Sequence, residues 1–142
     1  MSAAKPGGPR VVLDSNVYVS AFTHPQGPPF QIWRQGLARR YTLLICPAII
    51  SEVAESLRLD FDWDDARVIR RMKLLTRVAE VVIPKLTLEE IADDPDDDRI
   101  LECAVDSRAD LIVSGDRHLR RLKSFRGIGI IRPVDFHRTL GL

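Results

Sequence analysis

Short apolar runs alternate along the chain with segments in which apolar residues recur every three or four positions. The runs have the length of buried β-strands, and the recurring positions are typical of amphipathic helices. Alternation of the two patterns is typical of strand–helix–strand units around a parallel sheet. We therefore predict an α/β fold with a mainly parallel central sheet, whose strands cover residues 11–13, 41–46, 81–83, 111–113 and 128–131.

The helical pattern is clearest over residues 97–108, where apolar residues at 100, 101, 104 and 105 form one stripe. Further helices are predicted over residues 28–39 and 48–58. Another begins at Asp64 or Asp65, either of which can cap a helix, and runs to about residue 77. Glycines beside the 128–131 run and a proline after it predict an edge strand there. We expect one domain over residues 11–142, preceded by a flexible tail over 1–10.

Composition excludes several classes of protein. The 142 residues are 45% hydrophobic and 29% charged, which is typical of a globular domain. No apolar run is long enough to span a membrane, and the first residues lack the apolar stretch of a signal peptide, so we expect a cytoplasmic protein without membrane contact. Cys46 and Cys103 belong to no CxxC pair, which predicts buried thiols and excludes a zinc framework.

The charges nearly cancel but are unevenly placed. Lys and Arg number 21 and Asp and Glu 20, and this net charge of +1 does not by itself indicate a nucleic-acid partner. Seven of the ten residues from 89 to 98 are acidic, whereas residues 114–134 contain six Lys or Arg and one acid. Such patches can hold a cation beside a polyanion, although solvated helix faces show the same pattern.

Two aspartates directly follow predicted strands. Asp14 ends the run VVLD, and Asp116 ends LIVSGD. Ligands of open α/β sheets bind at the carboxyl ends of the strands, so both carboxylates are candidates for one crevice. Carboxylates that share a crevice repel each other and need a cation or a shared proton. For Asp14, the alternative is a turn or N-cap aspartate.

The helical wheel separates the members of the DPDDD cluster. Asp97 lies three, four and seven residues before Ile100, Leu101 and Ala104, which places it at the centre of the apolar stripe. Asp96 and Asp98 fall to either side, where they can point to water. An inward-facing aspartate without a partner is costly, so a bound metal is one explanation for Asp97.

Other sequence features do not select a site. By the wheel, Glu52 is a surface residue and Glu55 is equally plausible as a site residue. The segment DFDWDD lacks the glycine and the final glutamate of a calcium loop, and phosphate-binding and serine-hydrolase motifs are missing from the sequence. The three histidines show no metal-ligand spacing.

Four stretches together resemble the PIN-domain family, in particular the VapC-like toxin components of bacterial toxin–antitoxin systems. They are VVLDSNVYVSAF, PAIISEVAESL, DPDDDRILECAVDSRADLIVSGDRHL and IIRPVDF, which span most of residues 11–136. The third is the specific one, because an acidic loop, an ILECA helix and an LIVSGD strand occur in the family's order. The resemblance implies a three-layer α/β/α fold and a Mg²⁺- or Mn²⁺-dependent endoribonuclease.

The resemblance also implies a set of site residues. Asp14, Glu52, Asp97 and Asp116 correspond to the family's catalytic and metal-binding acids, and Glu52 is preferred to Glu55 because Leu57 follows it at the family's distance. The supporting polar positions match Asn16 and Ser114, and Asp98 is an alternate ligand. An RNA substrate, a cognate antitoxin protein and a homodimer are expected by the same analogy.

Basic residues near the last acid are candidates for holding the RNA backbone, namely Arg117, Arg120, Arg121 and Lys123. One alternative is a catalytically weak PIN-fold module that binds RNA or protein. Another is a phosphoacceptor domain, but the middle strand of such a domain would end in aspartate, whereas the predicted third strand ends in Ile83 and Pro84.

Overall fold

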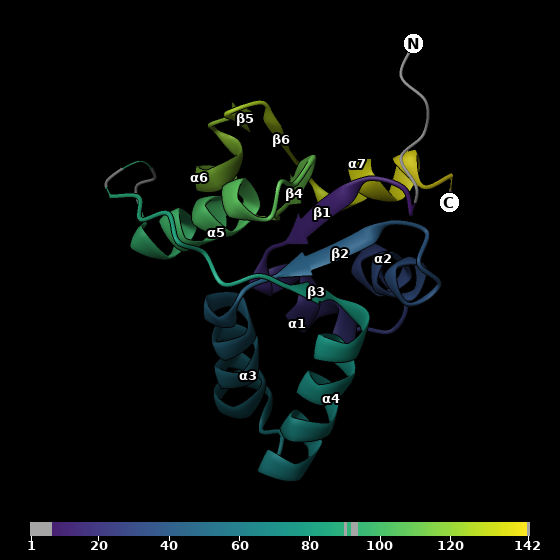
Figure 1. Ribbon diagram of the computed structural model, residues 1–142. Coiled ribbons are helices and arrows are strands. Elements are labelled where there is room, and N and C mark those ends of the chain that lie inside the picture. The colour runs from purple at the N-terminus through teal and green to yellow at the C-terminus, as the bar shows by residue number, and fades with distance from the viewer. Residues whose placement is uncertain (1–6, 90, 92–93, 142) are drawn as a thin grey trace.

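The computed structural model describes residues 7–89, 91 and 94–141. Its centre is a sheet of six strands in the order β3-β2-β1-β4-β6-β5 (Figure 1). The strands are β1 (Arg10–Leu13), β2 (Thr42–Ile45), β3 (Glu80–Val81), β4 (Leu111–Val113), β5 (Ser124–Phe125) and β6 (Ile128–Ile131). All neighbouring pairs are parallel except β5 with β6. The predicted α/β fold with a mainly parallel sheet is confirmed.

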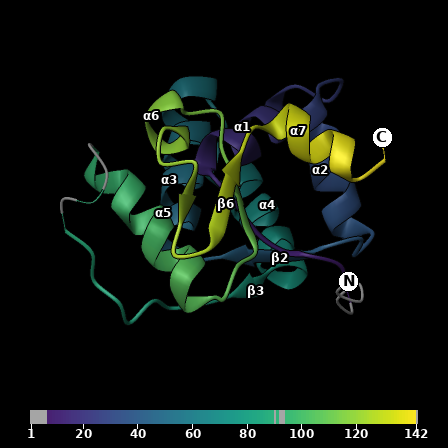
Figure 2. The same cartoon turned by 90° about the horizontal axis from the view of Figure 1, so that it is seen from above.

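Helices connect the strands and cover both faces of the sheet, which gives three layers (Figure 1). Helices α3 and α4 pack against each other as a hairpin that extends well below the sheet in this view. At one end of the molecule α7 packs against α2, and α5 lies towards the other end (Figure 2). The helices are α1 (Ser15–Thr23), α2 (Pro28–Leu37), α3 (Pro47–Phe61), α4 (Asp65–Val78), α5 (Pro95–Asp106), α6 (Arg117–Arg120) and α7 (Pro133–Thr139).

Helix α1 was not among the predicted elements. Its sequence SNVYVSAFT is apolar on most sides, so it lacks the one-sided stripe that reveals a surface helix. Tyr18 and Phe22 of α1 are buried and form an aromatic cluster with Trp33 of α2, with ring centroids 5.0 to 6.4 Å apart. The helix therefore belongs to the core, and its first residue follows β1 almost directly.

The prediction of an edge position for residues 128–131 is wrong. Strand β6 pairs with β4 on one side and with the short β5, which was not predicted, on the other. The glycine that suggested an edge has a packing reason, because a Cβ on Gly129 would lie 3.2 Å from Leu111 Cδ2. The edge strand is instead β5, which joins β6 through a tight turn at Gly127 with φ +81°.

The start of the chain joins the sheet earlier than expected. The predicted tail covers residues 1–10, of which 1–6 lie outside the described residues. Pro9 O accepts a hydrogen bond of 2.9 Å from Thr42 N, and β1 begins at Arg10. Cys46 and Cys103 are free and buried, as predicted. No helix in the described part of the chain is long and apolar enough to cross a membrane.

Candidate functional site

Two neighbouring strands bring Asp14 and Ser114 together. Leu13 of β1 pairs in register with Val113 of β4, so the residues that follow leave the sheet side by side. Ser114 Oγ donates a hydrogen bond of 2.6 Å to Asp14 Oδ2 and accepts one of 3.0 Å from Asp116 N. The predicted placement of Asp14 and Asp116 at adjacent strand ends is therefore confirmed, and Ser114 links them.

Asp14 is buried and also caps α1. Its Oδ1 accepts a hydrogen bond of 2.7 Å from Ser15 N, while Oδ2 is held by Ser114. Burial raises the pKa of Asp14, hydrogen bonds from Ser114 and Ser15 lower it, and the negative charge of Asp116 raises it further. The N-cap interpretation is thus correct for one oxygen. The capping role leaves unexplained why the whole carboxyl group is buried near a second acid.

Asp97 lies in the first turn of α5 and faces inward, as the wheel predicts. Its exposed fraction is 4%, and Oδ2 is buried without a hydrogen-bond partner among the residues that the structure describes. Its pKa is raised to about 7, first by burial and then by the negative charges of four further acids: Asp116, Asp14, Asp94 and Glu52. A buried carboxylate oxygen without a donor, among other acids, fits a cation as its missing partner.

Glu52 reaches the same cluster from α3. Burial raises the pKa of Glu52, a hydrogen bond with the Ser15 side chain lowers it, and the negative charges of Asp14, Asp96 and Asp94 raise it. The wheel did not separate Glu52 from Glu55. In the structure both residues line a cavity of about 210 Å³ between α3 and α5, and Glu52 is the one whose charge acts on Asp97.

Asp98 is buried, with an exposed fraction of 3%, so its predicted solvent-facing position is wrong. The segment before α5 runs back along the helix face that carries Asp98, Glu102 and Asp106. Leu88 N donates 2.7 Å to Glu102 Oε2, and Lys85 N and Leu86 N donate to Asp106 Oδ2. The helical wheel considers only the apolar residues of α5 itself. This acidic face is instead covered by residues 85–88, whose backbone N–H groups need hydrogen-bond acceptors.

The remaining candidates lie around the turn after β4. Asn16 is exposed, and its side-chain amide lies 3.8 Å from where a Cβ on Gly115 would be. Asp116 caps α6, with Oδ1 accepting 2.8 Å from His118 N. The predicted backbone-binding residues follow it along the chain; three are exposed, and Arg120 is half-buried with Nε unpaired, the full set being Arg117, Arg120, Arg121 and Lys123.

Sequence reasoning missed two residues of the site. Ser15 is buried, donates its backbone N–H to Asp14, and contacts Glu52 through its hydroxyl. Asp94 caps α5 by accepting 2.9 Å from Asp96 N, and its charge raises the pKa of Asp97. Capping geometry could have signalled both, because each stands at the start of a helix.

The acids of the cluster do not form a closed ligand shell. Within the described residues, no group of three or more His, Cys, Asp or Glu side chains is arranged so that it could hold a metal ion. The donor set nevertheless fits a hard divalent cation, because it consists of carboxylate oxygens, one of them buried without a partner. Asp14 and Asp97 would be the residues that hold such an ion most deeply.

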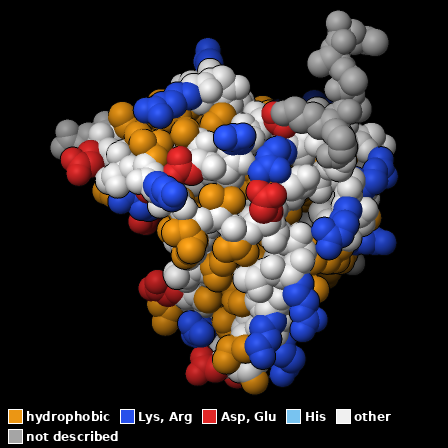
Figure 3. Space-filling model, in the orientation of Figure 1, with side chains coloured by type: hydrophobic (Ala, Val, Ile, Leu, Met, Phe, Trp, Pro, Cys, Tyr) orange, Lys and Arg blue, Asp and Glu red, His pale blue; other side chains and the backbone are white. Residues whose placement is uncertain are grey.

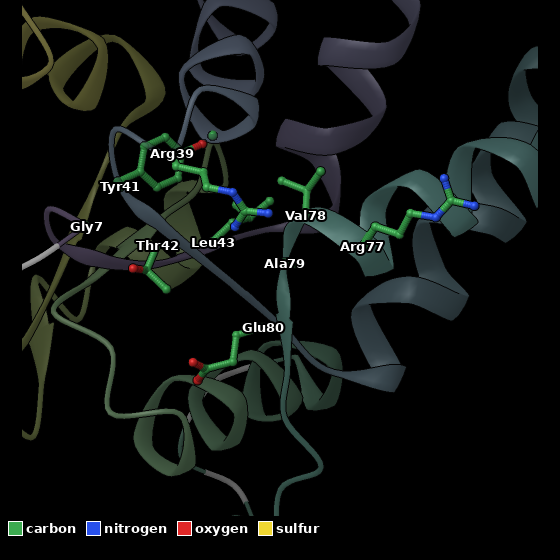
Figure 4. Close-up of a pocket in the computed structure, with 10 residues that line it drawn as sticks. Gly7, Arg39, Tyr41, Thr42, Leu43, Arg77, Val78, Ala79 and Glu80 are labelled. Atoms are coloured by element: carbon green, nitrogen blue, oxygen red, sulfur yellow. The ribbon is translucent and has the colours of Figure 1, made fainter.

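A separate cavity lies at the opposite, amino-terminal edge of the sheet. It measures about 330 Å³ and lies where β2 and β3 begin, between Arg39, Tyr41 and Glu80 (Figure 4). None of the candidate site residues lines it. The acidic cluster is thus confined to the carboxyl-terminal edge.

Comparison with known proteins agrees with this geometry. Residues 10–118 match the sequence model of the PIN domain family. The chain belongs to the PIN domain family. PIN domains are generally nucleases, and PIN nucleases generally use divalent metal ions. The match covers β1 to the start of α6 and so includes the four acids proposed from the sequence.

Individual relatives of this PIN domain are distant. An uncharacterised protein from Methanocaldococcus jannaschii is 25% identical over 119 residues, which are 80% of this chain and 75% of that protein. PAE2754 from Pyrobaculum aerophilum has a similar fold, with a TM-score of 0.61, 18% identity and coverage of 93% of this chain and 89% of the other. VapBC2 from Rickettsia felis, crystallised with a DNA fragment from its promoter, matches with a TM-score of 0.59, 12% identity, and coverage of 86% and 97%.

Proposed function

We propose that this PIN domain is a metal-dependent endoribonuclease that hydrolyses RNA phosphodiester bonds with the help of Mg²⁺ or Mn²⁺. The observation that carries the proposal is the Oδ2 atom of Asp97, which is buried and has no partner among the described residues. Its neighbours are acids that follow β1, lie in α3 or follow β4. A divalent cation held by these acids would supply a water of lowered pKa and would stabilise the charge that develops at phosphorus. The proposed catalytic residues and metal ligands are Asp14, Glu52, Asp97 and Asp116.

The other residues of the site have supporting roles in this proposal. Ser114 orients Asp14 and Asp116 through its two hydrogen bonds, and Asn16 stands at the neighbouring turn. Asp98 lies on the face of α5 that residues 85–88 cover, so it ranks behind these four acids as a ligand. The basic residues after Asp116 hold the RNA backbone without sequence preference, namely Arg117, Arg120, Arg121 and Lys123.

We further propose that the protein is the toxin of a toxin–antitoxin pair, acts in the cytoplasm, and forms a homodimer. The likeness of its fold to VapBC2 supports the pairing with an antitoxin. A protein partner also suits the surface of the α3–α4 hairpin, where hydrophobic side chains lie beside the Lys and Arg residues of α4 (Figure 3). On this hairpin Leu59 and Ile69 have exposed fractions of 74% and 48%.

The test is cleavage of a defined RNA pool by purified protein with Mn²⁺, with Mg²⁺ and with a chelator. We expect products only with a divalent ion, and a fall of about 100-fold or more for Asp14→Asn and Asp97→Asn, as when one electrostatic group of an active site is lost. Asp62→Asn is the matched control. Asp62 is exposed, has φ 56°, and ends α3 at the far tip of the hairpin, and asparagine tolerates that backbone conformation.

The outcomes separate the proposal from its alternative. Products that persist in both site variants would show that these acids are not the catalytic ones. A gel shift of RNA without products under any metal condition would establish a binding module with the PIN fold. Identical loss in Asp62→Asn would trace the change to folding.

A further inference from the structure

A cavity of about 320 Å³ opens between α1 and α3, directly beside the acidic cluster. At one end it is lined by Ser15, Asn16 and Glu52, all of which are part of the candidate site. At the other end it is lined by His24, just after α1, and Phe61, the last residue of α3. Glu52 and Phe61 are nine residues apart on one helix, which is about 14 Å along its axis. The cavity therefore leads away from the proposed metal-binding acids.

The far end of this cavity is formed by two aromatic rings. Phe61 has an exposed fraction of 40%, and its ring centroid lies 6.5 Å from that of His24, with the rings nearly perpendicular. The His24 ring is oriented by a hydrogen bond of 2.9 Å between its Nδ1 and Thr23 Oγ1. Val19, which is apolar, and Ser20, which is polar, line the same cavity. An exposed aromatic face beside polar groups suits a flat, amphipathic ligand.

We propose that this cavity binds an unpaired RNA base further along the strand from the cleaved phosphate, with the base stacked on Phe61. The inference rests on the proposed ribonuclease function and adds to it a subsite for one base of the substrate. Single-stranded RNA is recognised by splayed bases that stack on aromatic side chains, whereas bases within a duplex cannot enter a recessed site. The continuity of the cavity with Glu52 and Ser15 favours a part of the substrate over an unrelated small molecule.

The test measures binding, so that it does not depend on cleavage. The affinity of a fluorescein-labelled single-stranded RNA 12-mer is measured by anisotropy in the Asp97→Asn background, which keeps the RNA intact. Adding Phe61→Leu retains an apolar side chain but removes the ring. We expect the Kd to rise roughly 5- to 100-fold, as for the loss of one stacked base, and Phe61→Trp to retain tight binding.

Two controls sharpen the result. Leu59→Ala removes a more exposed apolar side chain from the same helix, outside the cavity, and we expect it to leave the Kd unchanged. In a second arm the 12-mer carries abasic sites in place of its bases. Here we expect Phe61→Leu to have no effect on the Kd, because the base that stacks is missing.

The proposal is overturned if Phe61→Leu leaves the Kd of the single-stranded RNA unchanged, which would leave the cavity to another occupant such as a protein segment. It is also overturned if Phe61→Leu raises the Kd of the abasic RNA as much as that of the ordinary RNA, because the cavity would then contact the RNA backbone. Neither outcome touches the proposed ribonuclease activity, which fails separately if Asp97→Asn still cleaves. Thermal melting of each variant checks that the fold is intact.

Discussion

Charged groups at the amino-terminal and the carboxyl-terminal edge of the central sheet are arranged in opposite ways. At the amino-terminal edge, Arg10 Nη2 lies 2.6 Å from Glu80 Oε2 and 2.8 Å from Ser107 O, and Arg10 N donates 2.8 Å to Asp110 Oδ2. At the carboxyl-terminal edge, Asp14 and Asp97 are buried side by side with other acids, and their pKa values are raised. The first edge joins opposite charges, and the second concentrates like charges.

The contrast indicates that the amino-terminal edge stabilises the fold and that the carboxyl-terminal edge binds a ligand. Paired charges at the start of the strands tie β1 to β3 and to the end of α5. Unpaired acids destabilise a metal-free protein, so their retention at the opposite edge is explained by a ligand that neutralises them.

Removing the charge of Asp97 should stabilise the metal-free protein. The pKa of Asp97 is about 7 in the folded protein, against an ordinary value of 3.8. Between these values the folded state binds more protons than the unfolded state, so stability falls as the pH rises. At about 1.4 kcal/mol for each pH unit, the wild type should lose on the order of 3 kcal/mol relative to Asp97→Asn between about pH 4 and pH 7.

Urea unfolding of both proteins in a chelator, across this pH range, measures the difference. A wild-type stability that stays parallel to that of Asp97→Asn would show that Asp97 is not held under electrostatic stress. Adding Mn²⁺ should reverse the order above pH 7, because a bound ion stabilises only the protein that retains its ligand.

Ser114→Ala should weaken metal binding while the fold survives. The Ser114 hydroxyl is buried, orients Asp14 Oδ2 and lowers the pKa of that carboxyl group, so its loss raises the pKa and frees the side chain. Loss of such an outer partner typically weakens metal affinity about 10- to 100-fold. A metal-binding carboxylate must be ionised, so the pH above which the variant binds Mn²⁺ should also be higher than for the wild type.

Calorimetric titration with Mn²⁺ measures the affinity, and Ser107→Ala is the matched control from the other edge. Ser107 is equally buried, but its hydroxyl donates only a long bond of 3.4 Å to Ala104 O. Equal affinities of the two variants for Mn²⁺ would contradict the supporting role of Ser114.

The sequence predicted the parts of this molecule that depend on local periodicity. The position of Asp14 after a strand and the inward direction of Asp97 follow from the pleat and the helical wheel, and the structure confirms both. The choice of Glu52 over Glu55 came from family resemblance, since both are exposed positions of one helix. What places Glu52 near Asp14 is the packing of α3 against α1, which no local pattern contains.

The predictions of exposure were wrong where a segment distant in the sequence covers a helix or strand. Asp98 is buried because residues 85–88 return along α5, and β6 is interior because β5 folds back onto it. Helix α1 was missed because burial on most of its sides removed the one-sided stripe. In each case the tertiary neighbour, not the local sequence, decides which side of an element meets water.

The smallest effect concerns the paired edge. Arg10→Met removes the ion pair with Glu80 and the hydrogen bonds to Ser107 O, but keeps a long apolar side chain. The ion pair is partly exposed and contributes little, so most of the loss comes from the hydrogen bonds to Ser107 O, for a total of about 1 kcal/mol.

The control is Arg40→Met, which removes an exposed arginine with a 3.4 Å bond to Gln35. It should change stability by less than about 0.5 kcal/mol. Urea unfolding measures both, and RNA cleavage and Mn²⁺ affinity should stay at wild-type values. A change in Mn²⁺ affinity in Arg10→Met would show that the two edges are coupled through β1. It would contradict separate roles in stability for one edge and in metal binding for the other.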